Sequence, residues 1–140
     1  MFPYNNQDEH KKFVSRKCSE IWTHHNECLA ARDISEFIKD FSEDCLFINN
    51  PLGGHAQGTY RGPAEIQKWC EKFFALFGNI NEFNVSQGAH LSHPDAENGV
   101  AMISWEIINN RYKVTGGVDT FVIKSGLFSI VTVVYEVQEL

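Results

Sequence analysis

The sequence lacks the features that define several large classes of protein. It has no stretch approaching the ~18 consecutive apolar residues of a membrane-spanning helix. No run of lysine and arginine stands out, and the net charge is −6. A chain of this kind has neither the basic patch that binds nucleic acid nor the charge that draws a protein to an anionic membrane. We therefore expect neither nucleic acid nor membrane as a partner.

Metal-binding and disulfide patterns are also missing. The four cysteines contain no C-x-x-C pair, and His55, His90 and His93 lack the spacing of metal ligands. The first twelve residues, MFPYNNQDEHKK, are polar and do not resemble a signal peptide. We expect a cytoplasmic protein with reduced, buried cysteines and with neither a metal nor another cofactor.

The composition that remains is that of a globular protein. The chain has 140 residues, of which 43% are hydrophobic, and 11 are Phe. This length is typical of one domain with a sizeable core. We expect one domain over residues 1–140, with residues 1–7 as a flexible tail.

Three helices are predicted in the first half of the chain. From Asp8 to Arg32 an apolar stripe recurs in steps of three and four residues, with His25 at its centre and His24 about 100° away at its edge. Asp33, followed by Glu36, is typical of the N-terminus of a second helix, over 34–41. Pro63 begins a third helix that ends at Phe77, before Gly78.

Strands are predicted elsewhere, over 45–49, 58–61, 80–91 and 100–109, and in a final hairpin from Gly116 to Val137. The turn-rich residues 50–54 follow the first strand, and Lys124-Ser125-Gly126 is the hairpin turn. Consecutive strands with short turns favour an antiparallel sheet, which the early helices cover on one face. We therefore predict the α+β class: a cone-shaped, curved antiparallel sheet packed on three helices around an internal apolar pocket.

Asp119 is the one charged residue within the first strand of the hairpin. Strict alternation places Thr115, Gly117, Asp119, Phe121 and Ile123 on one face of the strand. A carboxylate in such an apolar strand is costly unless it is paired or kept neutral by a raised pKa. Asp119 is therefore a candidate for the pocket, and a structural hydrogen bond to a neighbouring turn is the alternative.

His25 and Asp119 are the candidate catalytic pair. A histidine and an aspartate in one apolar cleft can exchange protons with a ligand. Aromatic residues and one amide are the candidate ligand-binding set: Trp22, Asn50, Trp69, Phe73, Trp105, Phe121 and Tyr135. The competing interpretation is that His25 is a satisfied core residue and that the aromatic residues are simply core.

Three stretches resemble the nuclear-transport-factor-2-like superfamily, within its SnoaL-like and ketosteroid-isomerase-like branch. They are DISEFIKDFSEDCLFINNP from Asp33 to Pro51, GTYRGPAEIQKW from Gly58 to Trp69, and the Asp119 hairpin. Together they cover nearly the whole chain from about residue 12. The resemblance implies the cone fold, but this fold hosts several kinds of enzyme and also non-catalytic association domains.

The resemblance also implies roles for single positions. The oxyanion-binding aspartate of ketosteroid isomerases matches Asp119, and their pocket tyrosine matches His25, or His24 if the register shifts by one. A late pocket aromatic matches Tyr135. The general-base aspartate that precedes a proline is replaced here by Asn50.

The leading functional prediction is a cofactor-independent enzyme of the isomerase, dehydratase or cyclase type that acts on a small apolar carbonyl compound. In it His25 moves a proton and Asp119 orients His25 or stabilises an oxyanion. The alternative is a non-catalytic ligand-binding or dimerisation domain.

We also predict a homodimer through the outer face of the sheet, because three helices on one face would leave Val118, Val122, Ile130 and Val134 of the other face in water. Alternation along the last strand places Phe128 on the same outer face. The resemblance implies the same arrangement, since many members of the superfamily that the chain resembles pair through this face. The competing explanation is that the N-terminal segment or the loop at 92–99 covers this face instead.

The replacement of the base by Asn50 predicts negligible isomerisation of β,γ-unsaturated ketosteroids. General-base catalysis is worth ~10²–10⁴-fold, so its loss is easily seen in a spectrophotometric assay. Asn50→Asp is the matching gain-of-function variant. Robust turnover by the unmodified chain would show that another residue acts as the base.

Overall fold

The computed structural model of the 140-residue chain describes residues 16–52, 57–77 and 83–140. In these ranges the elements follow in the order α2 (Cys18–Ala31), α3 (Ile34–Phe37), the 3₁₀ helix η1 (Ile38–Asp40), β1 (Phe41–Leu52), β2 (Gly58–Arg61), α4 (Gly62–Phe77), β3 (Phe83–Leu91), β4 (Gly99–Ile108), β5 (Tyr112–Lys124) and β6 (Leu127–Glu139). The predicted tail, the first turns of the first helix, the turn at 53–54, Gly78 and residues 80–82 lie outside the described residues.

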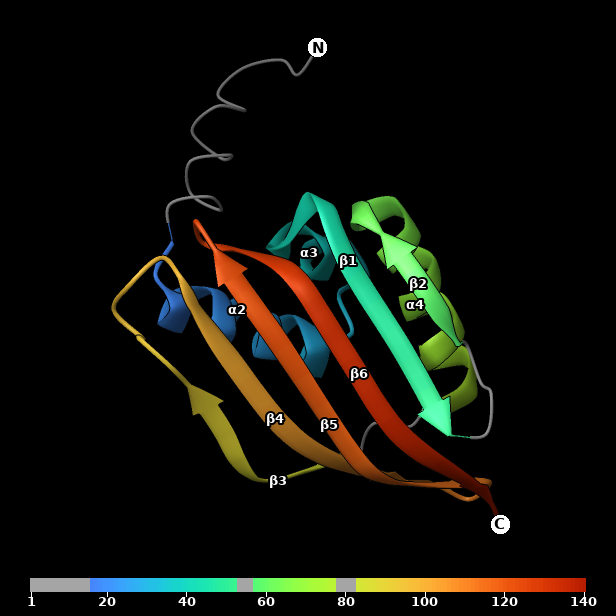
Figure 1. Cartoon of the computed structure of the whole chain (residues 1–140). Coiled ribbons are helices and arrows are strands. Elements are labelled where there is room, and N and C mark those ends of the chain that lie inside the picture. The colour runs from blue at the N-terminus through green and yellow to red at the C-terminus, as the bar shows by residue number, and fades with distance from the viewer. Residues whose placement is uncertain (1–15, 53–56, 78–82) are drawn as a thin grey trace.

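The six strands form one curved sheet, and the helices lie together on one of its faces (Figure 1). The strand order is β2-β1-β6-β5-β4-β3. The predicted α+β cone is therefore confirmed. One detail of the prediction is wrong, because β1 and β6 run parallel, with Phe47 opposite Val131. All other neighbouring strands are antiparallel, as expected.

Strand β1 is longer than its sequence suggested. It runs through Pro51 to Leu52, where a loop was expected after Asn49. Pairing with β2 reaches only from Leu46 to Asn49, so Pro51 lies beyond the register of β2, where a missing backbone N–H is tolerated. Residues 45, 47, 49 and 51 of β1 are buried and the alternate residues are more exposed. This alternation places Asn49 against the core and Asn50 on the outer side.

A bulge in β5 changes which residues face the helices. The register shifts between Thr115 and Val118, where Gly116 has a φ of 62°. Such a bulge inserts one residue and reverses the alternation beyond it. Tyr112 and Val114 are therefore buried on the same side as Phe121, whereas strict alternation had placed Val114 on the opposite face.

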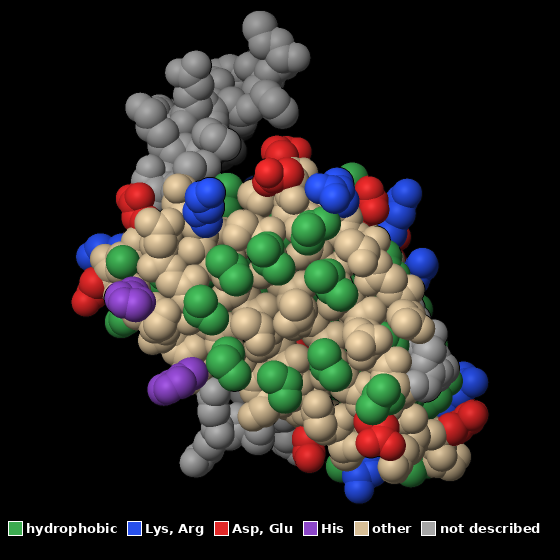
Figure 2. Space-filling model, in the orientation of Figure 1, with side chains coloured by type: hydrophobic (Ala, Val, Ile, Leu, Met, Phe, Trp, Pro, Cys, Tyr) green, Lys and Arg blue, Asp and Glu red, His purple; other side chains and the backbone are tan. Residues whose placement is uncertain are grey.

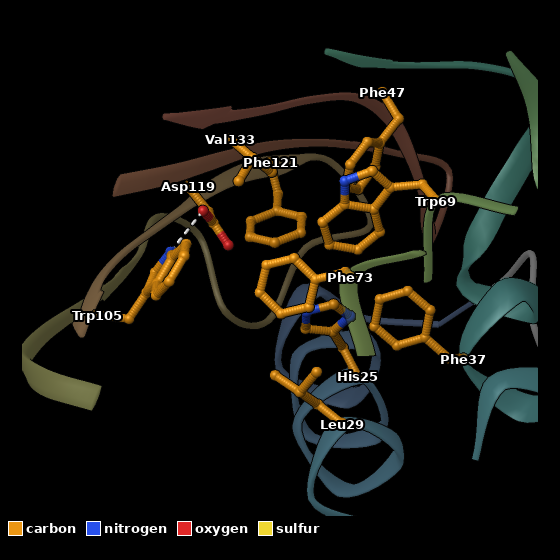
Figure 3. A pocket seen from close by; sticks show the side chains of 10 residues that line it. All are labelled: His25, Leu29, Phe37, Phe47, Trp69, Phe73, Trp105, Asp119, Phe121 and Val133. Atoms are coloured by element: carbon orange, nitrogen blue, oxygen red, sulfur yellow. Dashed lines mark hydrogen bonds between the residues drawn. The ribbon is translucent and has the colours of Figure 1, made fainter. Parts of the chain in front are cut away.

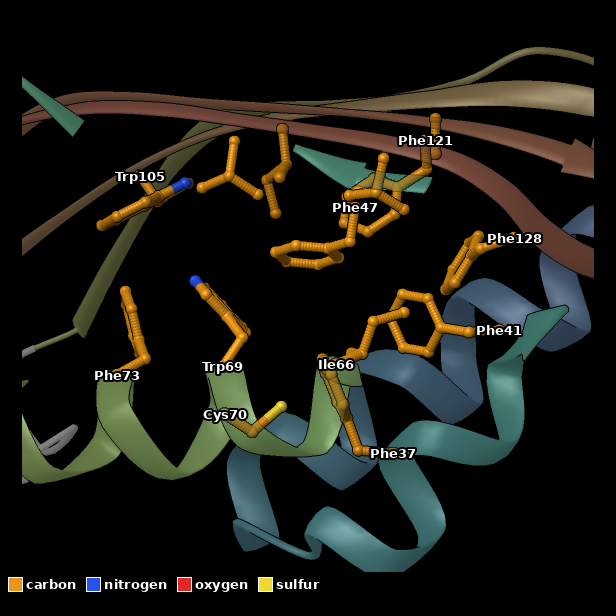
Figure 4. Close-up of a cluster of buried hydrophobic side chains, with 14 of the residues drawn as sticks. Phe37, Phe41, Phe47, Ile66, Trp69, Cys70, Phe73, Trp105, Phe121 and Phe128 are labelled. Carbon is orange, nitrogen blue, oxygen red and sulfur yellow. The ribbon is translucent and has the colours of Figure 1, made fainter. Parts of the chain in front are cut away.

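The core fills the space between the helices and the concave face of the sheet. Aromatic rings from α3, β1, α4, β4, β5 and β6 interlock there (Figure 4). Phe128 is fully buried against Phe121, with ring centroids 4.7 Å apart. A register shift between Val122 and Ile123 accompanies this position, so the prediction that Phe128 lies on the outer face is wrong.

A buried ionic cluster ties the helices to the tip of the β5–β6 hairpin. Asp40, at the end of η1, has no exposed surface and accepts hydrogen bonds from Arg16 Nη1 at 2.8 Å and from His24 Nδ1 at 2.7 Å. Arg16 Nη2 also donates to the carbonyl oxygen of Gly126 at 3.3 Å. The cluster joins the start of α2, η1 and the hairpin turn.

The loop at 92–98 packs against the start of α2 and the hairpin tip. The backbone N–H of Cys18 donates to Ala96 at 2.7 Å, and that of Gly126 donates to Glu97 at 3.0 Å. The hairpin turn itself has positive φ at Ser125 and Gly126, as the Ser-Gly pair predicted. The loop therefore lies at the end of the sheet and does not cover the outer face.

The outer face of the sheet is apolar over most of its width (Figure 2). Its exposed apolar residues, which we call the outer apolar face, are each 37–45% exposed: Ile48, Val100, Met102, Ile108, Val118, Ile130 and Val134. Three of the four residues predicted there, Val118, Ile130 and Val134, are among them, and Val122 is half-buried.

Asp40→Asn should lower the free energy of unfolding by ~3–5 kcal/mol, because removing one charge of a buried pair leaves the other without compensation. Urea denaturation measures the change. Glu139→Gln is the control, since Glu139 lies 3.9 Å from Arg111 in a highly exposed pair that should contribute little. Equal small effects of both variants would contradict a stabilising role for the Asp40 cluster.

Candidate functional site

One pocket lies in the cone, between α2, α3, α4 and the concave face of the sheet (Figure 3). Its ten described lining residues are His25, Leu29, Phe37, Phe47, Trp69, Phe73, Trp105, Asp119, Phe121 and Val133. Its volume is about 40 Å³, which is enough for water molecules but far below the ~300–1,000 Å³ of typical ligand pockets. The pocket is therefore a small apolar space with two ionisable side chains in its wall.

His25 belongs to the buried stripe of α2 and is enclosed by aromatic rings. Its ring stacks on Trp22 at 5.6 Å and meets Phe37 at 4.9 Å and Phe121 at 5.0 Å, between centroids. Burial, with a smaller contribution from neighbouring His24, lowers the pKa of His25 to about 3. His25 is therefore a neutral imidazole over the physiological pH range. Its Nδ1 atom is buried and has no hydrogen-bond partner among the described residues.

Asp119 enters the pocket from β5. Its Oδ1 accepts a hydrogen bond of 2.7 Å from the indole Nε1 of Trp105 on β4. Burial raises the pKa of Asp119 from 3.8 to about 7, against the smaller opposing effect of this hydrogen bond. The residue keeps some accessible surface because it borders the pocket, but its neighbours are too apolar to solvate a carboxylate. At neutral pH, Asp119 is divided between its acid and carboxylate forms.

Gly117 holds the indole of Trp105 in place. The two residues are opposite one another in the β4–β5 ladder. A Cβ atom at position 117 would lie only 2.4 Å from Trp105 Cδ2, so any larger residue would displace the indole. The missing side chain thus allows Trp105 to lie flat over β5 and to reach Asp119 two residues further on.

The structure brings His25 and Asp119 to the same pocket without joining them. No hydrogen bond links the two side chains, both of which are described in full. Phe121 contacts the ring of His25 and follows Asp119 on the same face of β5. A ligand in the pocket would thus meet two separated polar groups.

The other residues predicted to bind ligand divide into three groups. Trp69, Phe73, Trp105 and Phe121 line the pocket. Trp22 and Tyr135 lie one layer behind it, where Trp22 stacks on His25 and Tyr135 packs on Trp105 at 5.2 Å between centroids. Asn50 is exposed on the opposite side of β1, so the prediction that it faces the ligand is wrong.

Asn49 is the asparagine of β1 that faces the core, and it is not among the residues predicted for the site. It is 1% exposed, and its amide donates to the hydroxyl oxygen of Tyr135 at 3.2 Å. Burial raises the pKa of Tyr135 to about 12, against the smaller opposing effect of this hydrogen bond. The alternation Cys45, Phe47, Asn49 was the signal for it, but the predicted strand ended too early for the alternation to be extended to position 50.

His24 is not the pocket histidine. Its ring bonds to Asp40 and lies 3.3 Å from Glu36 Oε2, outside the pocket lining. Cys28 Sγ lies 3.5 Å from His24 Nε2, but burial and the nearby carboxylates raise the pKa of Cys28 to about 11. A thiol of that pKa is a poor nucleophile at neutral pH, so this group is not a Cys-His-Asp catalytic site.

Other kinds of site find no support in the ranges that the structure describes. No group of three or more His, Cys, Asp or Glu side chains among them is arranged to hold a metal ion. Within the same ranges, no helix is both long and apolar enough to cross a bilayer.

Comparison with known proteins shows the fold. No protein-family model matches the chain, and no curated protein matches its sequence. Solved structures match at low identity. TerC, co-crystallised with polyporic acid, is 14% identical, with 83% of this chain and 88% of TerC covered and a TM-score of 0.61.

Two further solved structures show the same similarity of fold. An NTF2-like protein from Burkholderia xenovorans LB400 is 13% identical, covering 94% of this chain and 87% of its own, with a TM-score of 0.58. A protein with a cystatin-like fold from Methylobium petroleophilum PM1 is 14% identical, covering 84% and 74%, with a TM-score of 0.61. At these identities the likeness concerns architecture.

Asp119→Asn should stabilise the protein progressively as the pH rises from about 4 to about 7. In that interval the unfolded chain loses the Asp119 proton and the folded chain keeps it. The free energy of unfolding of the unmodified protein therefore falls as the pH rises. An asparagine cannot ionise, yet its carbonyl oxygen can still accept from Trp105. The gain above pH 7 should be about 2–4 kcal/mol, since one pKa unit is worth ~1.4 kcal/mol.

Urea denaturation at several pH values between 4 and 9 measures this difference. Asp95→Asn, in the exposed 92–98 loop, is the matched control and should show no such pH dependence. A stability difference that is the same at every pH would show that the pKa of Asp119 is ordinary.

Proposed function

We propose that this protein, which has the fold of NTF2-like proteins, binds a small uncharged carbonyl compound in its cone pocket and catalyses acid–base chemistry on it without a cofactor. The reaction class is that of isomerases, dehydratases or cyclases. The observation that carries the proposal is Asp119, a carboxyl group with a pKa of about 7 in an otherwise apolar pocket. A catalytic acid or base works best when its pKa lies near the working pH.

In this proposal Asp119 is the residue that transfers the proton. His25 was the expected proton carrier, but an imidazole with a pKa of about 3 is too weak a base to hold a proton at neutral pH. His25 instead presents a neutral ring at the pocket wall and can orient the ligand. Burial reverses the usual order of the two pKa values, so that the aspartate and not the histidine titrates near neutral pH.

Trp105 supports this role of Asp119. Its indole N–H donates to one carboxyl oxygen, which fixes the carboxyl plane and leaves the second oxygen for the ligand. The same hydrogen bond stabilises the carboxylate form and so opposes the effect of burial. Without it the pKa of Asp119 would be higher and less of the base form would exist at neutral pH.

The pocket volume limits the ligand. About 40 Å³ holds the reacting carbonyl group and a few attached atoms, and a larger molecule would require lining side chains such as Phe73 to rotate. TerC, a structure of the same fold, was co-crystallised with polyporic acid, which supports the presence of a ligand site in this architecture.

The alternative proposal is a non-catalytic ligand-binding or dimerisation domain. The small pocket favours it, and the β1 residue that faces the core, Asn49, is an amide that cannot act as a base. The two proposals differ in one respect that can be measured, namely whether Asp119 exchanges a proton with a bound carbonyl compound.

We also propose that two copies pair through the outer apolar face. The described loop that could have covered this face, at 92–98, is bonded to α2 and to the hairpin tip instead. An apolar patch that crosses four strands is rare on monomers, and a two-fold axis would bury it against itself.

The protein should accelerate exchange of the methyl protons of acetone for deuterium in D₂O, which proton NMR measures directly. The Asp119 carboxylate takes a proton from the methyl carbon and the enolate forms. The carboxyl proton then exchanges with D₂O, and the deuterated carboxyl group gives a deuteron to the same carbon. The rate should rise with pH and level off above about 7, because the carboxylate is the base. Asp119→Asn should lose ~10²–10⁴-fold of the acceleration.

Asp95→Asn is the control for this assay and should exchange acetone at the native rate. Native protein that gives only the buffer rate, with acetone bound in the pocket, would support the non-catalytic alternative. An Asp119→Asn variant as active as the native protein would exclude Asp119 as the base.

Sedimentation at micromolar concentration should give twice the 16.0 kDa mass of the chain. Val134→Lys, in the outer apolar face opposite Val118, should shift the protein to monomer, because a lysine cannot be buried against its symmetry mate without a large desolvation cost. Gln67→Lys, on the exposed side of α4, should remain dimeric. A native monomer would exclude the pairing.

A further inference from the structure

Two buried polar atoms at the pocket have no partner. Trp69 Nε1 on α4 and His25 Nδ1 on α2 have no hydrogen bond within the described ranges, although their residues are only 6% and 5% exposed. Buried polar atoms of this kind are uncommon and destabilising, and each calls for an explanation, such as a bound molecule. Both residues line the same pocket.

The indole of Trp69 is placed to serve a ligand. Its ring packs on Phe47 at 4.5 Å and on Phe73 at 4.8 Å between centroids, so neighbouring side chains hold its plane. Figure 4 shows the indole nitrogens of Trp69 and Trp105 both turned toward the space between α4 and the sheet. Trp105 uses its N–H for Asp119, whereas the N–H of Trp69 remains available.

The chemistry of the pocket specifies what Trp69 can bind. An indole N–H is a donor only, so its partner must be an acceptor atom. None of the ten described lining residues is Lys or Arg, and the one readily ionised group, Asp119, carries negative charge. An anion would therefore lose its hydration and meet a carboxylate instead of a cation, which is strongly unfavourable.

We infer that Trp69 Nε1–H is the hydrogen-bond donor that holds the carbonyl oxygen of the ligand, and that the pocket accepts uncharged carbonyl compounds and rejects carboxylates of the same shape. This inference rests on the proposed function, since it concerns the same pocket. It assigns the anchoring of the ligand to α4, while the proton-transfer group stands on β5. The neutral ring of His25 supplies a second polar contact from α2.

Three molecules with the same four-heavy-atom skeleton test the inference: acetone, dissolved 2-methylpropene and acetate. The indole N–H resonances of the three tryptophans in a ¹⁵N-labelled sample are the readout, assigned with Trp69→Phe and Trp22→Phe. Acetone should move the Trp69 N–H resonance downfield in a saturable way, since its oxygen accepts the hydrogen bond. 2-Methylpropene lacks the oxygen and should give no downfield shift, and acetate should give none at pH 8.

Trp69→Phe should weaken acetone binding about 2- to 10-fold, as followed by the methyl resonances of Val133 in the pocket, since one neutral hydrogen bond is lost. Trp22→Phe is the matched control because Trp22 lies behind His25 and outside the lining, and it should bind acetone with native affinity.

The outcomes separate this inference from the proposed function. If acetone shifts Val133 while the Trp69 N–H resonance stays in place, the pocket binds carbonyl compounds and the role of Trp69 is wrong. If acetate binds as well as acetone, the charge selectivity is wrong. If none of the three molecules changes either signal, the pocket binds no small carbonyl compound, and both the inference and the proposed function fall.

Discussion

Burial of ionisable groups among aromatic rings is the physical constraint that sets the protonation states of the pocket. The same desolvation lowers the pKa of His25 to about 3 and raises that of Asp119 to about 7, since both groups are pushed toward their neutral forms. The result is a pocket with no permanent charge at slightly acidic pH and one negative charge at alkaline pH. Among the ten described side chains that line it, only the carboxyl group of Asp119 changes its charge near neutrality.

The sheet provides the geometry for that pocket. Its curvature leaves room between the strands and the helices, and the bulge at Gly116 lets both ends of β5 bury their side chains on the concave side. Gly117 allows Trp105 to lie across β5 and bond to Asp119. The position of the carboxyl group therefore depends on two adjacent glycines and one indole, and on backbone geometry as much as on side-chain packing.

The two faces of the sheet differ in burial and in the side chains they present. The concave face holds the aromatic core and the pocket, whereas the convex face presents a row of partly exposed aliphatic residues (Figure 2). The buried Arg16–Asp40–His24 cluster fastens the helical layer to the hairpin tip. Among the described elements, none of the helices covers the outer side of the sheet, so the helical layer and a partner on the convex face would not compete.

The sequence by itself determined the elements and the candidate residues, because apolar periodicity and turn chemistry act over short distances along the chain. The stripe of α2 pointed to His25, and the lone acid in an apolar strand pointed to Asp119. Only the tertiary structure decided that Asn49 and not Asn50 faces the core, that β1 runs parallel to β6, and that Val114 and Phe128 are buried. A bulge reverses the alternation of side chains, and the end of a strand sets how far the alternation extends. Both depend on pairing with strands that are distant in the sequence. The reversed order of the pKa values of His25 and Asp119 has the same origin, because the pKa of each group depends on the rings that the fold packs around it.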